Sequence, residues 1–274
     1  MKTLKNVMLV VAGMMLVCPV QIQAQDENER PQFVVMTTTH RNFDYEDGSR
    51  EDWIALEKEY LEKVTEKNDF IMSTAVLNHF YTGDNSELIR ITTYKTWADI
   101  TAAQARNDEL AEAAWPDESE RDAFFKKRNS YFTNHHSDEI YRTIPGAKFP
   151  AEQSDESKIV YIQKSHIDFP ADGSVDDIQA IRKEYVDAVI RPNSLVLGYY
   201  PLRHGWGADN REVVDIFIYN SLADLEASAK IQDDLSIAHW PDEAKRDAFF
   251  DRMDEYYSGW HGDFIYRSMP TISK

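Results

Sequence analysis

The sequence predicts an α+β protein built from two tandem copies of one β-α-β-β-α-β domain. The first observation is a duplication: residues 115–125 return at 240–250, 125 positions later, with only two differences. The second is an alternation within each copy. Stretches rich in Val and Thr, typical of strands, alternate with stretches in which apolar residues recur at helical spacing. A chain of 274 residues is long enough for two such domains.

The same offset continues on both sides of this motif and defines the domain boundaries. It pairs Tyr94 with Tyr219 and Tyr141 with Tyr266, among others. We therefore expect a first domain over 31–145 and a second over 158–270. The segment 146–157 contains Gly, Pro and charged residues without periodicity, so it is expected to be a linker.

The elements of the first copy follow from local patterns. Strands are expected at 33–40, 71–82, 88–94 and 139–144, and a helix at 52–67, where apolar residues recur at helical spacing. Thr96 with Asp99, and Ser221 with Asp224, form the pattern of a capping box at the start of a second helix. Pro116, followed by acidic residues, is expected to open a third helical segment. The resulting order is that of a ferredoxin-like split βαβ unit.

The N-terminal segment 1–24 has the pattern of a secretory signal peptide. Lys2 and Lys5 precede an apolar run over 7–20, and Ala24 precedes the expected cleavage point. The run is short for a membrane span, and acidic residues follow it. We therefore expect a periplasmic or secreted protein. The lipoprotein alternative would use Cys18, but Val17 fits a lipid-attachment site poorly.

Charge and cysteine content exclude several classes of function. The net charge is −18, which disfavours nucleic acid and anionic membranes as partners. Cys18 is the only cysteine and lies in the expected leader, so the mature chain has no thiol for disulfides, thiol catalysis or thiolate metal sites.

The paired domains and the Trp-Pro-Asp motif followed by Phe-Phe resemble the dimeric α+β barrel superfamily. Within it, the chain is most similar to NIPSNAP-like and antibiotic-biosynthesis-monooxygenase-like domains. The resemblance implies two sheets that pack face to face, here as an intramolecular α+β barrel. The chain would then be a monomer that mimics a dimer, although a homodimer stays open.

Strand alternation suggests which side chains line such a barrel. Ile89 and Ile91 of the third strand are expected to face the helices, as are Val214, Ile216 and Ile218. The alternating polar and aromatic residues are expected to face inward and line a pocket for a small organic ligand. These are Arg90, Thr92, Tyr94, Asp215, Phe217 and Tyr219, with Tyr141, Tyr161, Gln163 and Tyr266 of other strands. The alternative is a polar sheet interface filled by its own hydrogen bonds.

Six of the eight histidines form matched pairs, which makes them candidate catalytic residues. The pairs are His40 with His166, His79 with His204, and His136 with His261. In the expected topology the three histidine positions of each copy lie on the same rim of the sheet. One imidazole could act as a general base beside Tyr94 or Tyr219. Three could bind a metal, although no metal is assigned, and histidines at strand ends often only cap backbone groups.

Three functions follow as hypotheses. The resemblance implies an enzyme, either a cofactor-free monooxygenase or a lyase, cyclase or isomerase acting on a small aromatic or polyketide-like compound. A haem or metal protein is a second possibility, because relatives of this barrel bind haem. The third is a non-catalytic small-ligand-binding or structural module, since no complete catalytic motif is present. The sequence identifies no cofactor.

Overall fold

The structure is a computed structural model that describes residues 30–152 and 154–274. The expected leader 1–24 lies outside the described residues. Pro31–Lys274 form one compact unit. Within the described part of the chain, no helix is long and apolar enough to cross a membrane.

Each copy contributes four strands and three α-helices. The elements of the first copy are β1 (Phe33–Arg41), α1 (Arg50–Lys63), η2 (Thr65–Lys67), β2 (Ser73–Tyr81), β3 (Glu87–Tyr94), α2 (Trp97–Ala114), α3 (Glu118–Ser130) and β4 (Phe132–Thr143). Those of the second copy are β5 (Ile159–Ile167), α4 (Val175–Tyr185), η3 (Val186–Ile190), β6 (Gly198–Trp206), β7 (Glu212–Tyr219), α5 (Leu222–His239), α6 (Glu243–Asp254) and β8 (Tyr257–Ser268). The C-terminal turn η4 (Pro270–Ile272) follows.

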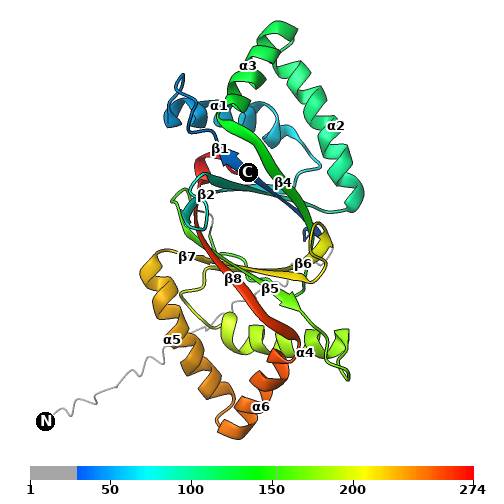
Figure 1. Cartoon of the computed structure of the whole chain (residues 1–274), viewed down its shortest axis with the longest axis vertical. Helices are drawn as coiled ribbons and strands as arrows, with labels where there is room; N and C mark the ends of the chain where they lie inside the picture. Colours follow the sequence, from blue (N-terminus) through cyan, green and yellow to red (C-terminus); the bar gives the residue numbers. More distant parts are fainter. Residues whose placement is uncertain (1–29, 153) are drawn as a thin grey trace, which may run out of the picture. The chain divides into compact units, whose positions relative to one another are not determined.

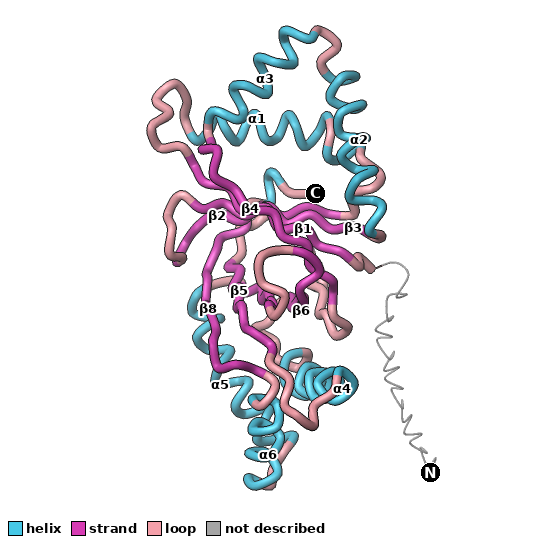
Figure 2. Tube along the Cα trace, turned by 45° about the vertical axis from the view of Figure 1, so that its right-hand side comes forward, coloured by secondary structure: helices cyan, strands magenta, loops and turns pink. Residues whose placement is uncertain are grey.

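The eight strands close into one antiparallel barrel in the order β1-β3-β2-β8-β5-β7-β6-β4. The copies join along two seams, where β2 pairs with β8 and β4 pairs with β6. The helices of each copy cover the outside of its own sheet (Figure 1; Figure 2). The expected α+β fold with an intramolecular barrel is therefore confirmed, and the barrel places residues of both copies side by side.

Local sequence signals set most element boundaries. Thr96 and Asp99 make both bonds of the predicted capping box, and Ser221 accepts a hydrogen bond from the Asp224 amide. Helix α3 begins one residue after its cap, Asp117, so Pro116 precedes the helix rather than opening it. Strand β4 begins at Phe132, seven residues before the predicted start.

The barrel interior is lined mainly by apolar side chains, and the predicted facing of β3 and β7 was wrong. The interior core contains Val34, Met36, Leu77, Ile89, Tyr141, Val160, Ile162, Leu202, Val214, Ile216 and Tyr266. The aliphatic residues of β3 and β7 therefore point into the barrel, away from the helices. The polar residues that alternate with them face the helices, because charged helix side chains there bind Arg90 and Asp215.

Candidate functional site

The reversal of the two faces separates the predicted pocket residues. Tyr141 and Tyr266 lie in the barrel interior as predicted. Arg90, Thr92, Asp215 and Phe217 instead lie in the layer between sheet and helices. So do Tyr161, which packs against the helix-side cluster of the second copy, and Gln163, which bonds Asp263. The predicted residues therefore do not form one pocket.

Tyr94 and Tyr219 also lie on the helix side. Tyr94 packs with Ala103 of α2, and Tyr219 packs with Val186 and Ile190 of η3. Burial raises the pKa of Tyr94 to about 12, and it raises the pKa of Tyr219 as well. Both phenols are core residues that stay protonated, and neither is brought beside a rim histidine that could act as the general base.

A buried ion pair occupies the layer between sheet and helices of the first copy. Glu57 of α1 is only 2% exposed and binds Arg90 at 2.8 Å and Arg128 at 2.9 Å. Burial alone would raise the pKa of Glu57, but the two guanidinium groups outweigh it and hold that pKa at about 2. The carboxylate is therefore fixed in its charged form.

The second copy holds the same pair with its charges reversed. Arg182 stands at the place of Glu57 and binds Asp215, at the place of Arg90, at 2.6 Å. Tyr199 and Tyr257 complete the group through hydrogen bonds to Arg182. Since all these groups are paired, both layers are closed polar cores rather than open sites.

The six candidate histidines are distributed along the strand ends and do not gather. His40 binds Asp84, His166 binds Asp209, His136 lies 3.5 Å from Asp138 and His261 lies 3.3 Å from Asp263. His136 lies within β4 rather than before it. No group of three or more metal-ligating side chains is arranged around a metal site among the residues described.

Polar neighbours surround most of these histidines. Four of the six contact a carboxylate, and His79 bonds the Thr82 hydroxyl at 2.7 Å. His40 stacks on His135, and His166 stacks on Trp260, with ring centroids 4.4 and 4.1 Å apart. The rings are held as parts of the rim.

A polar cluster spans the copies inside the barrel around Tyr141. The Tyr141 hydroxyl lies 2.5 Å from Glu139 and also contacts Glu212. Lys164 lies 3.1 Å from Glu212 and 3.5 Å from Glu139. Burial first, and then the two carboxylates, raise the pKa of Tyr141 far above its usual range. His204 is the backbone partner of Tyr141 across the β4–β6 seam.

The matched place in the other half is simpler. Tyr266 donates a hydrogen bond to Glu87 at 3.0 Å. By the 125-residue offset, Phe264 stands in place of Glu139. The group of two carboxylates around one phenol therefore exists on one side of the barrel.

The first copy also has a pocket at the edge of its sheet, which we call the rim pocket. Its volume is about 250 Å³. It lies between the end of β1, the loop that follows, the start of α1 and the start of β4. The lining residues are Arg41, Asn42, Phe43, Tyr45, Gly48, Ser49, Arg50, Trp53, Tyr131 and Phe132.

Two buried polar groups of the rim pocket lack a hydrogen-bond partner among the described residues. The indole nitrogen of Trp53 and the hydroxyl of Tyr131 are buried and make no hydrogen bond with any described residue. Trp53 is 2% exposed and lies under the guanidinium of Arg41, at 4.7 Å from the ring centroid. Buried polar atoms are nearly always hydrogen-bonded, so these two groups indicate a missing partner.

The equivalent place in the second copy is filled. Ile167 and Ile178 stand where the first copy has Arg41 and Trp53, and they pack in one apolar cluster with Tyr256. The hydroxyl of Tyr256, which corresponds to Tyr131, donates to Asp177 at 2.6 Å and accepts from the Ser174 amide at 2.9 Å. The same fold therefore forms a satisfied core in one copy and an unsatisfied pocket in the other.

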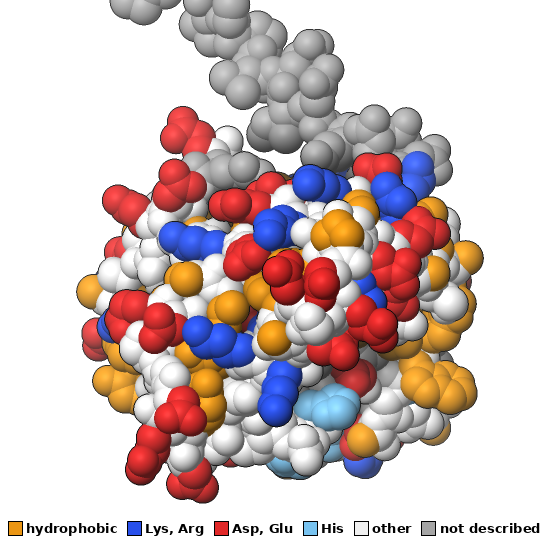
Figure 3. All heavy atoms as spheres, turned by 90° about the horizontal axis from the view of Figure 1, so that it is seen from above, with side chains coloured by type: hydrophobic (Ala, Val, Ile, Leu, Met, Phe, Trp, Pro, Cys, Tyr) orange, Lys and Arg blue, Asp and Glu red, His pale blue; other side chains and the backbone are white. Residues whose placement is uncertain are grey.

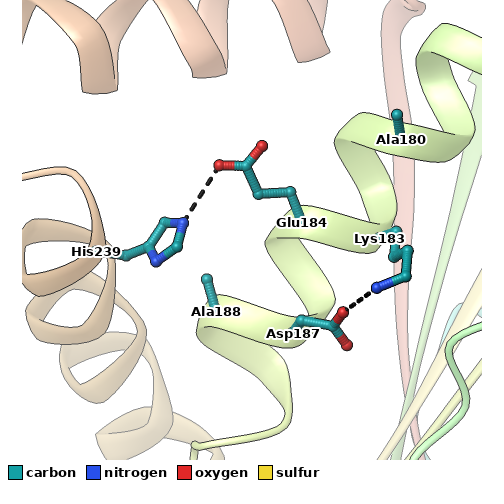
Figure 4. Close-up of a pocket in the computed structure, with 6 residues that line it drawn as sticks. All are labelled: Ala180, Lys183, Glu184, Asp187, Ala188 and His239. Carbon is teal, nitrogen blue, oxygen red and sulfur yellow. Dashed lines mark hydrogen bonds and ion pairs between the residues drawn. The ribbon is translucent and has the colours of Figure 1, made fainter.

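A larger depression of about 470 Å³ lies between α4, η3 and α5. In Figure 4 its polar side chains point toward one another. Glu184 lies 3.2 Å from His239 and accepts from the Trp240 indole at 3.1 Å, while Lys183 binds Asp187. The first copy repeats the tryptophan contact, since Trp115 bonds Glu59. The polar side chains Lys183, Glu184, Asp187 and His239 of this depression are therefore all paired with one another or with Trp240.

The rim pocket was not predicted from the sequence, although a signal for it is present. The predicted catalytic residues were ones that the copies share, whereas the rim pocket depends on two positions, Arg41 and Trp53, in which the copies differ. Arg41 and Trp53 carry N–H donors at places where the second copy has the aliphatic residues Ile167 and Ile178. Such a difference between copies indicates where one of them has a separate role.

Comparisons with known proteins support the fold. No family model and no curated protein matches the chain by sequence. A proposed monooxygenase from Lactobacillus acidophilus NCFM has a TM-score of 0.56 at 7% identity, covering 88% of this chain and 95% of its own. A proposed monooxygenase from Fusobacterium nucleatum has a TM-score of 0.53 at 10% identity, covering 87% and 93%. A mutant chlorite dismutase from Candidatus Nitrospira defluvii has a TM-score of 0.52 at 12% identity, covering 89% and 94%. The chain thus has the dimeric α+β barrel fold that its sequence led us to expect.

Proposed function

We propose that this protein binds a small organic molecule in the rim pocket of its first copy, and that the second copy serves as the structural half of the barrel. The observation that carries the proposal is the pair of buried, unpartnered polar groups, Trp53 Nε1 and Tyr131 Oη, beside a cavity of about 250 Å³. A cavity of 150 Å³ already accommodates benzene, so this space suits a compound with one ring.

The test uses the second copy as a guide. The double variant Arg41→Ile with Trp53→Ile gives the first copy the residues that fill the equivalent place in the second. We expect saturation-transfer NMR with a fragment library to detect compounds that bind the native chain and not the double variant. Circular dichroism should show that the variant keeps its fold. The proposal fails if no fragment distinguishes the two proteins.

We also propose that the protein acts outside the cytoplasm, in the periplasm or beyond the cell. The motivation is the order of charged, apolar and small residues over 1–24. Mass spectrometry of protein isolated from the native cell should find an N-terminus at Gln25. An intact Met1 on the mature protein would contradict this.

A second candidate function is acid–base catalysis at the Tyr141 cluster. The supporting observation is a phenol held by two carboxylates beside Lys164, with side chains of Glu139, Lys164 and Glu212 that are 24%, 23% and 12% exposed. A carboxylate there could remove a proton from an activated C–H group, while the phenol and the ammonium group keep it oriented. Proton abstraction of this kind gives a carbanion, which a cofactor-free oxygenase passes to molecular oxygen as co-substrate and which carbanion-forming lyases, cyclases and isomerases also use.

This candidate has its own test and control. Compounds that bind the protein are incubated in D₂O, and deuterium incorporation is followed by NMR. We expect exchange that Glu212→Gln abolishes and that Tyr266→Phe, on the simpler side of the barrel, leaves intact. Exchange that is equal in native protein and Glu212→Gln would refute a catalytic role for the cluster.

A further inference from the structure

The chemistry of the rim pocket points to a class of ligand. We propose that the rim pocket binds a small carboxylate with a flat apolar body, such as an aromatic acid; this inference rests on the proposed function. Four features of the pocket lead to it: the type of its unpaired polar groups, its charge, its walls and its difference from the second copy.

The unpaired groups are donors. The Trp53 indole nitrogen can only donate, and it has no acceptor. Arg41 uses one guanidinium nitrogen to donate to Asn78 at 2.7 Å, which leaves further N–H groups. The exposed side chain of Arg50 forms no hydrogen bond or ion pair with a described residue, and the Tyr131 hydroxyl can donate as well. A ligand that satisfies these groups must supply several acceptor atoms, as the two oxygens of a carboxylate do.

The two arginines of the pocket agree with an anion. Burial lowers the pKa of Arg41, and the neighbouring charge of Arg50 lowers it further. Two like charges that oppose each other are stabilised by a bound negative charge. Two adjacent arginines stand out on this protein, because the chain carries a net charge of −18. Asp and Glu side chains are spread over the face seen in Figure 3.

The segment around the pocket also carries five carboxylates, Asp44, Glu46, Asp47, Glu51 and Asp52, and the charge of Asp52 acts on Tyr131. Asp52 accepts from the Ser49 amide at 3.0 Å and from the Ser49 hydroxyl at 2.7 Å. These bonds, the backbone one first, lower the pKa of Asp52. Its negative charge contributes, after burial, to a raised pKa of Tyr131, so Tyr131 stays a neutral donor. Asp52 thus caps α1, and neither arginine is paired with it.

The walls of the pocket are aromatic. Tyr45 packs edge-on against Tyr131 with ring centroids 4.9 Å apart, and Trp53 packs edge-on against Phe132 at 6.0 Å. Phe43 also lines the pocket and is 65% exposed. Rings in such positions favour a flat apolar body. Together with the donors and the two arginines, they favour an aromatic acid over inorganic phosphate, which has no apolar body.

The experiment uses benzoate and its neutral isostere benzamide on the full mature chain. Both are titrated while the indole N–H resonances are recorded by ¹H–¹⁵N NMR, with Trp53→Phe used to assign the Trp53 resonance. We expect benzoate to shift that resonance and to bind at least tenfold more tightly than benzamide. We also expect Arg41→Met to weaken benzoate at least tenfold. The matched control Arg203→Met, at an exposed arginine of β6, should leave binding unchanged.

The other outcomes are distinct. If benzamide and benzoate shift the Trp53 resonance with equal affinity, the pocket binds small molecules but the carboxylate inference is wrong. If inorganic phosphate binds as tightly as benzoate, the site selects only for negative charge, and the inference of a flat apolar body is wrong. If none of the three shifts the Trp53 resonance, the carboxylate inference fails. If the fragment library also contains no compound that prefers the native chain, the proposed function fails with it.

Discussion

Arg182 binds Asp215 at 2.6 Å at the place where the first copy has the opposite pair, Glu57 with Arg90. The two copies have therefore kept an ion pair between the first helix and the third strand while exchanging which element carries which charge. An isolated buried charge is costly, so one partner could change sign only together with the other. The pair is a structural requirement of the fold rather than the mark of a site.

The first prediction concerns the removal of one partner. Glu57→Gln leaves Arg90 and Arg128 without their carboxylate in a mostly buried place. We expect it to lower the free energy of unfolding by roughly 3 kcal/mol or more, measured by urea denaturation. As a control, Lys230→Gln breaks the exposed Lys230–Asp234 pair and should leave the transition almost unchanged. Equal effects of the two variants would contradict the structural role of Glu57.

The second prediction is a pH dependence with a defined sign. The pKa of Glu57 is about 2 in the folded protein, against an ordinary value of 4.5. The folded state therefore binds this proton more weakly than the unfolded state. Its stabilisation, about 3 kcal/mol, is complete above pH 4.5 and is lost as the pH falls from 4.5 toward 2. Urea unfolding at a series of acidic pH values should show this loss in the native chain and a smaller loss in Glu57→Gln.

The third prediction compares two equivalent tyrosines. Tyr131→Phe removes a buried hydroxyl that has no partner, so we expect the melting temperature to stay the same or to rise by about 2 °C. Tyr256→Phe removes a hydroxyl bonded to Asp177 and the Ser174 amide, so the melting temperature should fall. Differential scanning calorimetry without ligand measures both. A fall of the same size in both variants would show that Tyr131 has a partner within the protein.

The fourth prediction concerns the glycine that admits the Tyr131 ring. A β-carbon at Gly48 would lie 2.1 Å from the Tyr131 hydroxyl oxygen, whereas one at Gly83 would meet nothing within 4 Å. We expect Gly48→Ala to displace Tyr131, to cost about 1–3 kcal/mol and to weaken ligand binding. Gly83→Ala should change neither property. If Gly48→Ala left the ligand affinity unchanged, Tyr131 would not contribute to binding in the rim pocket.

Much of the fold could be predicted from local signals. The Thr96–Asp99 capping box depends only on neighbouring residues, so it located the start of α2 correctly. The start of β4 was missed because 133–138 is polar and exposed and shows no strand alternation. Its pairing with β1, for example Thr39 with His136, depends on a distant strand.

The facing of the third strands required knowledge of distant partners. Arg90 and Asp215 look like pocket residues from the sequence, and only Glu57 and Arg182 on the helices explain why they are buried on that side. Once these charges are paired, the alternating aliphatic residues fill the barrel. The rim pocket is likewise defined by missing partners; the difference between the copies at Arg41 and Trp53 marks the place, but the sequence does not show that their N–H groups are unpaired.

The indole N–H resonance of Trp53, followed while a fragment mixture is added to the mature chain, tests the rim pocket most directly. We expect this resonance to shift when a ligand supplies the acceptor that Trp53 lacks, and the shift to disappear in Arg41→Ile. A shift of Trp240, whose indole bonds Glu184 beside the depression of Figure 4, with Trp53 unchanged, would place binding in the second copy and contradict the proposed function.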